Sequence, residues 1–493
     1  MAMRAGTCCP FKLRNSNRAL ANGRRLRFVQ GVDVPAAPPN AVSPRTCVTL
    51  LGVAVAVRLA LALGTDVYFD EAYYWQWARH LAWGYFDHPP LIAWWIAAVG
   101  IRPAALLCGA GTAAALWGLA RDVHGSREAA WRAAALWSVL PVATMTGVLA
   151  TPDAPLLLFW TLALWALWRE RWVLAGLASG LALLSKYPAV LIALAFLVTA
   201  VRQRRLPAGA WVTALLGVLL FLPVVLWNAH REWVGFAFQL RHGLSGSGQL
   251  KFFAEFLGGQ LALGGPVLLP LALVYAVRGP REQFLLRAAT LIPLLFFGYA
   301  ALRARGEANW PAAAYLTTCV GVAGMRPVWF RVAAFSGLAI VLVMSSHLLF
   351  PVVRLPRDIP LARTHGWDVL SALAEPGRLF PGAQAQRVAV VYAPNYQYAS
   401  QAARYSGLPA DTAGDVRKSQ YDLWPEPPLA PGQDALYYAE GFKPPASLTS
   451  RFTSVEGPVE LTSDFRGRRV HTFQVWWLRG AHPESSLSPR GPP

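Results

Sequence analysis

Long apolar runs, separated by short polar segments, dominate the chain between residues 47 and 353. A helix needs about 20 apolar residues in succession to cross a bilayer, and a shorter run crosses only part of it. By this criterion the pattern predicts about eleven spanning or partly spanning helices. Their ranges are 47–64, 103–120, 129–150, 154–168, 172–184, 188–201, 210–227, 257–277, 288–302, 310–324 and 332–353. We therefore expect a mainly α, polytopic membrane protein.

The composition agrees with this expectation. Of the 493 residues, 55% are hydrophobic and 14% are charged, which is little charge for a soluble chain of this length. The net charge of +19 comes from Lys and Arg residues that cluster between apolar runs. No nucleic-acid-binding signature accompanies them, so we expect no nucleic-acid partner. The five cysteines lack the spacing of a zinc site or a disulfide framework.

Arginine clusters predict the orientation. Because cytoplasmic loops carry an excess of Lys and Arg, loops that hold such clusters are expected inside the cell. The clusters alternate regularly with the helices and lie at Arg121 and Arg127, Arg169 and Arg171, Arg202 to Arg205, Arg278 to Arg287, and Arg326 and Arg331. The basic segment 1–45 is then a cytoplasmic tail, which we expect to be disordered. A composition rich in Ala, Arg and Pro suits a bacterium, so the predicted location is the bacterial inner membrane, with several spans and a cytoplasmic N-terminus.

The remaining connections are predicted to face outside. They are 65–90, 151–153, 228–256 and 303–309, and they hold most acidic, histidine and amide side chains of the membrane part. The transmembrane domain is expected to cover residues 46–353. From residue 354 to residue 482 the chain becomes polar, with β-rich runs at 388–392, 435–438 and 470–478, a helical stretch at 396–405 and a hairpin turn at Arg466-Gly467. We predict a small extracytoplasmic α/β domain there, followed by a disordered tail at 483–493.

Two of the apolar runs, 172–184 and 188–201, are too short to cross the bilayer fully, and they meet at Lys186. Pro188 cannot donate a backbone hydrogen bond and tends to end a helix. A broken helix pair at membrane depth is tolerated only where it is buried in protein or lines a wet cavity. Lys186 is therefore expected to point into such a cavity and to need an acidic partner or an anionic ligand. The alternative is an amine that reaches the interface along Tyr187.

The first outer connection holds five candidate residues, of which one, Tyr74, is aromatic. Asp70 and Glu71 open a helix, either as capping residues or with Asp70 as a general base at the mouth of a cavity. Tyr74 belongs either to an interfacial aromatic belt or to a substrate site. Asp87 and His88 precede two prolines, and they could hold a phosphate, ligate a divalent metal or cap the next helix.

The second and last outer connections carry further polar residues at helix starts. Asp153 caps a helix or supplies a second carboxylate to the cavity, and Asn309 caps a helix or binds substrate. Arg303 and Arg305 break the positive-inside pattern, which an anionic ligand such as phosphate would explain.

Asn228 and His230 begin an aromatic-rich outer loop that forms an interfacial helix or a lid. Together with the residues above, they belong to a set of short motifs. These are Phe69–Tyr74, Phe86–Leu91, Pro152–Leu156, Ser185–Tyr187, Leu226–His230 and Asn309–Ala312. With them the chain resembles the integral-membrane glycosyltransferases of the GT-C class, of family 39 type, which include protein O-mannosyltransferases and the aminoarabinose transferase of lipid A. The connection 91–103 is shorter than the resemblance leads one to expect.

The resemblance implies a GT-C-like fold and transfer of a sugar from a polyprenyl-phosphate donor to a lipid, glycan or protein acceptor, with inversion. Asp70 would be the general base and Asp153 a second catalytic acid. Asp87 and His88 stand where relatives bind phosphate or a divalent metal, the one cofactor left open. The remaining substrate-binding candidates are Glu71, Tyr74, Lys186, Asn228, His230, Arg303, Arg305 and Asn309.

A transporter or flippase of lipid-linked sugars is the alternative function. Such proteins place their site near the bilayer midplane, between internal repeats. Here the polar groups gather in the outer loops, and no clear repeat is visible. The sequence therefore favours the enzyme, with membrane lipids as its surroundings.

Overall fold

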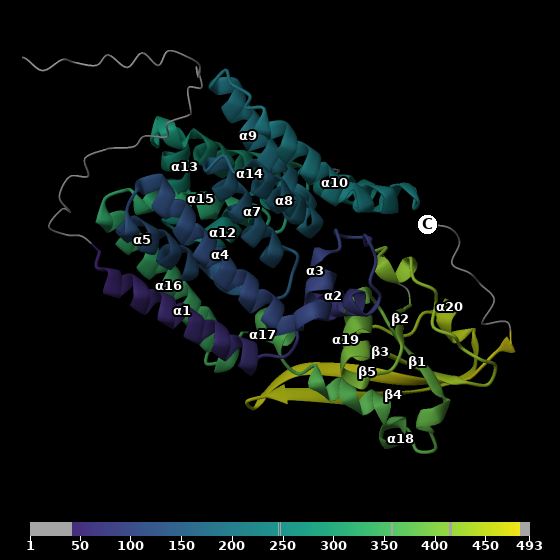
Figure 1. The fold of residues 1–493 in the computed structure, drawn as a ribbon. Helices are drawn as coiled ribbons and strands as arrows, with labels where there is room; N and C mark the ends of the chain where they lie inside the picture. The colour runs from purple at the N-terminus through teal and green to yellow at the C-terminus, as the bar shows by residue number, and fades with distance from the viewer. Residues whose placement is uncertain (1–41, 245, 247, 356–357, 414–416, 484–493) are drawn as a thin grey trace, which may run out of the picture. The chain divides into compact units, whose positions relative to one another are not determined.

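The computed structural model of the protein describes residues 42–483 except 245, 247, 356–357 and 414–416. The two segments expected to be disordered, 1–45 and 483–493, fall almost wholly outside this part of the chain. The described residues belong to one unit, in which a large helical part is joined to a smaller part with a sheet (Figure 1).

Sixteen α-helices make up the helical part of the described chain. They are α1 Pro44–Gly64, α2 Phe69–Arg79, α3 Leu91–Val99, α4 Ile101–His124, α5 Arg127–Ser138, α6 Pro141–Thr146, α7 Asp153–Trp168, α8 Trp172–Ser185, α9 Val190–Arg202, α10 Gly209–Ala229, α11 Val234–Leu244, α12 Leu250–Gly264, α13 Leu268–Arg278, α14 Phe284–Arg303, α15 Ala312–Ala323 and α16 Pro327–Leu349. Each predicted apolar run corresponds to one helix or to a broken pair. The expectation of a mainly α, multi-pass membrane protein is therefore confirmed.

The lengths of these helices differ in a way that the apolar pattern only partly predicts. Within the described residues, α1, α4, α10, α14 and α16 are long and apolar enough to cross a membrane, and α12 with α13 forms a sixth candidate bent by 95°. The apolar helices α7, α8, α9 and α15 are shorter. The run 129–150 is divided into α5 and α6 at Pro141, because proline has no N–H to continue the helix. The connection 91–103 contains α3, a helix that the sequence analysis did not predict.

Helix α10 is held to the bundle by a contact between small residues. Its most apolar stretch is only 11% buried, and it packs along α8. A Cβ atom on Gly176 of α8 would lie 2.9 Å from the carbonyl oxygen of Thr213 and 3.1 Å from its Cα. Gly180, one turn later, approaches Leu220 as closely. Small residues spaced in this way let two membrane helices approach at backbone distance.

The C-terminal part contains a five-stranded sheet of order β2-β1-β3-β5-β4. The strands are β1 Val388–Ala393, β2 Ala410–Thr412, β3 Asp434–Ala439, β4 Phe452–Phe465 and β5 Arg468–Ala481. β1 pairs in parallel with β2 and β3, whereas β5 is antiparallel to β3 and β4. The predicted strands correspond to β1, β3 and β5, and the predicted helix to α19 Tyr396–Ser406. The remaining helices are α17 Ile359–Thr364, α18 Pro376–Leu379 and α20 Ala446–Thr449.

The predicted hairpin turn also lies where expected, between β4 and β5. Arg466 and Gly467 both have positive φ, 49° and 73°. A two-residue hairpin with both central residues in this region has a twist that matches that of the strands. Strands β2 and β4 were not predicted, since one has three residues and the other alternates weakly on an edge.

Helix α19 joins the two parts by packing on α2 (Figure 1). The Gln401 amide donates to the carbonyl oxygen of Val67 at 2.8 Å, and the N–H of Val67 donates to the Tyr405 hydroxyl at 3.0 Å. The rings of Tyr73 on α2 and Tyr396 on α19 lie 4.5 Å apart. One apolar cluster also runs from α2 and α3 into the sheet. The two parts therefore share a core.

Replacing Gly176 with alanine tests the contact between α8 and α10. The added methyl group meets the backbone of Thr213, which cannot move aside, so we expect Gly176→Ala to lower the free energy of unfolding by about 1–3 kcal/mol. Gly52→Ala on α1 is the control, because a Cβ there has nothing within 4 Å. The measurement is thermal unfolding of the purified protein in detergent. Equal midpoints for the two variants would contradict the tight contact.

Candidate active site

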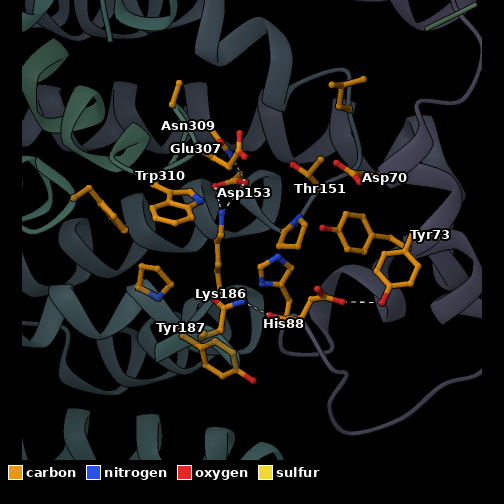
Figure 2. A pocket seen from close by; sticks show the side chains of 18 of the residues that line it. Asp70, Tyr73, His88, Thr151, Asp153, Lys186, Tyr187, Glu307, Asn309 and Trp310 are labelled. Carbon is orange, nitrogen blue, oxygen red and sulfur yellow. Dashed lines mark hydrogen bonds and ion pairs between the residues drawn. The ribbon is translucent and has the colours of Figure 1, made fainter. Parts of the chain in front are cut away.

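All four outer loops meet at one cavity of about 1370 Å³. The helical part supplies residues from 68–88, 145–153 and 186–191, from α11 and α12, and from 296–310. The C-terminal part supplies Arg363, Asn395 to Gln397 and Arg417. We call this cavity the chamber. In Figure 2, Asp153, Lys186 and Asn309 point toward one another on one side of the view, and Asp70 enters from α2 on the other side of Thr151.

Asp70 is the second residue of α2 and is half-buried in the chamber wall. Its Oδ1 atom accepts a hydrogen bond of 3.0 Å from the side-chain amide of Gln397. Within the described part of the chain, no other hydrogen-bond donor reaches this carboxylate. Asp70 therefore does not cap its helix, and its carboxylate is directed at the chamber instead.

Glu71 takes the capping role that the sequence left open between the two residues. Its Oε2 atom accepts from the N–H of Tyr68 at 3.0 Å, and Oε1 accepts from the N–H of Ala150 at 2.8 Å. The guanidinium of Arg102 lies 3.3 Å from Oε2 and donates to the carbonyl oxygen of Val148 at 3.1 Å. Glu71 is 0% exposed and does not line the chamber. Through these hydrogen bonds, Glu71 connects the segment before α2 with the segment before Asp153.

Asp153, Lys186 and Asn309 form a closed group. The amine of Lys186 lies 2.9 Å and 3.0 Å from the two carboxylate oxygens of Asp153, and the Asn309 amide donates to Oδ2 at 2.8 Å. The expected acidic partner of Lys186 is thus Asp153. Both Asp153 and Asn309 use their side chains here, so neither caps a helix.

Asp87 is held between the helical part and the C-terminal part. Its Oδ2 atom accepts from the Tyr73 hydroxyl at 2.7 Å, and Oδ1 accepts from the Arg417 guanidinium. His88 and Tyr74 line the chamber beside it, with their rings 6.3 Å apart. Among the described residues, no group of three or more His, Cys, Asp or Glu side chains is arranged to hold a metal ion. The divalent metal that the sequence left open at Asp87 and His88 stays a prediction.

The other predicted residues are divided between the chamber and its surroundings. Arg305 lines the chamber and forms an ion pair with Glu255 at 3.3 Å. Arg303 is exposed at the end of α14 and is not among the lining residues. Asn228 is buried, where its side-chain oxygen accepts from the N–H of Gly235 at 3.0 Å, and His230 is exposed. The structure thus leaves Arg303, Asn228, His230 and Glu71 outside the lining.

Sequence reasoning missed many lining residues, among them four that are charged or reach a charged group. Gln397 and Arg417 come from the C-terminal part, Arg363 from α17 and Glu307 from the last outer loop. The string Asn395 to Ala399 carried a faint signal, since it resembles the outer domains of the family. Arg363 and Arg417 lie in polar segments without a motif, and only the fold brings them to the chamber.

Burial raises the pKa of the Asp70 carboxyl from 3.8 to about 6. The Gln397 hydrogen bond and the nearby guanidinium groups of Arg363 and Arg417 oppose this effect, and Asp87 adds to it. Asp70 is therefore ionised at neutral pH, with a basicity well above that of an ordinary aspartate. A carboxylate with such a pKa can accept a proton from a bound hydroxyl group.

The closed group around Asp153 predicts a coupling in stability. Asp153 is 3% exposed and Lys186 is 7% exposed, so removing either charge leaves the other buried without its partner. We expect Asp153→Asn and Lys186→Met each to lower the free energy of unfolding by about 3 kcal/mol. The double variant should recover most of this loss, because no lone charge remains. Thermal unfolding in detergent measures the three variants, and a double variant no more stable than the singles would contradict the pairing.

Two comparisons of the sequence find similar proteins. Residues 87–227 match the family described as dolichyl-phosphate-mannose-protein mannosyltransferase. The chain is 27% identical to the lipid A galacturonosyltransferase RgtD of Rhizobium johnstonii, over 78% of this chain and 85% of that protein.

Two solved structures share the fold. The apo structure of ArnT from Cupriavidus metallidurans matches with a TM-score of 0.55 and a sequence identity of 16%. The structure of the same protein bound to undecaprenyl phosphate matches with a TM-score of 0.56 and a sequence identity of 14%. Each match covers 88% of this chain and 98% of the other. The family match, the curated relative, the shared fold and the charged chamber lead to one conclusion: the chain is a membrane glycosyltransferase that is similar to those of the GT-C class.

Proposed function

We propose that the protein transfers a sugar from a polyprenyl-phosphate donor to the hydroxyl group of an acceptor on the extracytoplasmic side of the bacterial inner membrane. Asp70 is the general base. The observation that carries this proposal is the chamber itself, in which a carboxylate with a pKa of about 6 shares one space with the cationic side chains of Lys186, Arg305 and Arg363.

The reaction follows from the charges in this space. The oxygen of the acceptor hydroxyl forms a bond to the anomeric carbon of the sugar, and Asp70 accepts the proton that this hydroxyl loses. The bond between that carbon and the phosphate oxygen breaks on the opposite face, so the configuration inverts and the polyprenyl phosphate leaves with the bonding electrons. Cations that hold the leaving phosphate stabilise the charge that develops on it. Exposed Arg363 has no ion pair among the described residues and is our first choice for this role.

The chamber also offers apolar walls for a lipid. Side chains of α9, α12 and α14, including Leu191, Leu263 and Phe297, line it beside the polar groups. A long isoprenoid chain needs such a surface next to its phosphate. The ArnT structure that holds undecaprenyl phosphate supports a donor of this kind, and the relative named for lipid A supports a lipid acceptor.

The arginine clusters support the proposed orientation. They lie in the connections α4–α5, α7–α8, α9–α10, α13–α14 and α15–α16, whereas the chamber is built from the connections at the other ends of these helices. If the basic loops are cytoplasmic, the chamber and the C-terminal domain face outward.

Substituting Asp70 tests the base. We expect Asp70→Asn to lower sugar transfer at least 100-fold, because an amide cannot accept the acceptor's proton, while the protein still inserts and unfolds at nearly the wild-type temperature. Purified protein is incubated with undecaprenyl phosphates that carry galacturonic acid, mannose or an aminopentose, and products on a lipid A acceptor are read by mass spectrometry. Wild-type turnover in Asp70→Asn would remove Asp70 from this role.

The raised pKa of Asp70 predicts a pH profile. The carboxyl is protonated below its pKa of about 6 and is then unable to act as a base. The transfer rate should therefore fall about tenfold per pH unit below 6 and level off above it. Initial rates with saturating donor between pH 4.5 and pH 8 measure this profile, and folding is checked by fluorescence at each pH. A rate that stays constant down to pH 4.5 would be incompatible with the proposed base.

A further inference from the structure

We propose that Gln397, a residue of the C-terminal domain, is a positioning residue for the general base: its amide fixes one oxygen of Asp70 and leaves the other for the acceptor hydroxyl. This inference rests on the proposed function, since it concerns the carboxylate that we propose as the base. It gives the C-terminal domain a part in the chemistry, beyond closing the chamber.

The contact crosses between the two parts of the molecule. The Nε2 atom of Gln397 donates to Oδ1 of Asp70 at 3.0 Å, over a separation of 327 residues in the chain. Gln397 lies in the first turn of α19, where the Asn395 side chain accepts from the N–H groups of Gln397 and Tyr398 at 3.0 Å each. This cap fixes the backbone from which the amide extends.

The rest of α19 cannot move away from α2. Gln401, one turn after Gln397, donates to the carbonyl oxygen of Val67, and the Tyr405 hydroxyl accepts from the N–H of the same residue. Gln401 and the α2 residue Tyr73 are both almost fully buried. The amide of Gln397 is thus presented to Asp70 by a helix that is fixed at both its first and its last turn.

The amide has two physical effects on the carboxylate. A hydrogen bond to one oxygen restricts rotation of the carboxyl group, so the second oxygen keeps one direction toward the chamber. A donor also stabilises the ionised form, which opposes the effect of burial. Without Gln397 the carboxylate would rotate more freely and would hold its proton up to a higher pH.

The test compares two glutamines of the same helix. Gln397→Met keeps the length of the side chain but removes the donor, and Gln401→Met removes the neighbouring hydrogen bond to Val67 without touching Asp70. For Gln397→Met we expect the acid limb of the pH–rate profile to move up by about one unit. At pH 6, kcat should fall about fivefold, whereas KM for an undecaprenyl-phosphate sugar should change less than twofold. Gln401→Met should lower the unfolding temperature and leave the acid limb of the pH–rate profile at its wild-type position.

Gln397→Glu is a second variant, which keeps the inference testable if the methionine variant folds poorly. It places a second acid beside Asp70, and two carboxyl groups that share a site cannot both ionise easily. The acid limb should therefore move further up than in Gln397→Met. An unchanged limb in both Gln397 variants would overturn the inference, as would an equal shift in Gln401→Met.

These outcomes are distinct from failure of the proposed function. If Asp70→Asn is inactive while both Gln397 variants keep the wild-type profile, Asp70 is the base and Gln397 does not position it. If Asp70→Asn is fully active, the base is another group and both proposals are wrong.

Discussion

A buried carboxylate, Glu71, joins the segments on which the chamber depends. It accepts hydrogen bonds from the N–H groups of Tyr68 and Ala150 and is paired with Arg102. Asp70 lies beside it in the chain, and Asp153 follows Ala150 by three residues. Charges out of reach of water are retained only when they are paired and hydrogen-bonded. The cost of breaking this group therefore keeps the two candidate carboxylates, Asp70 and Asp153, in a fixed relation.

Much of the fold could be predicted, because a bilayer constrains sequence strongly. Apolar runs gave the helices, and alternating arginines indicated that the polar loops would share one side. Local chemistry also sufficed for the turn at Arg466-Gly467. Helix breaks without a proline signal were harder to predict, since the bend between α12 and α13 depends on packing within the bundle.

The candidate site could be predicted in part. Asp70, Asp153, Lys186 and Asn309 reach the chamber because helix ends place them there. Glu71 has the same chemistry as Asp70 and is its neighbour, yet it turns inward, because residues on adjacent helix positions point about 100° apart. No local pattern could reveal the contact of Gln397 with Asp70, because the two residues lie 327 positions apart in the chain.

That separation has a consequence for biosynthesis. α19 packs on β1 and β2 of a sheet in which β5, the neighbour of the central strand β3, ends only at Ala481. A nascent chain can insert every membrane helix and still lack the folded sheet that supports α19. If Gln397 positions Asp70 as we propose, the site is complete only when the last strand has been made and has joined the sheet.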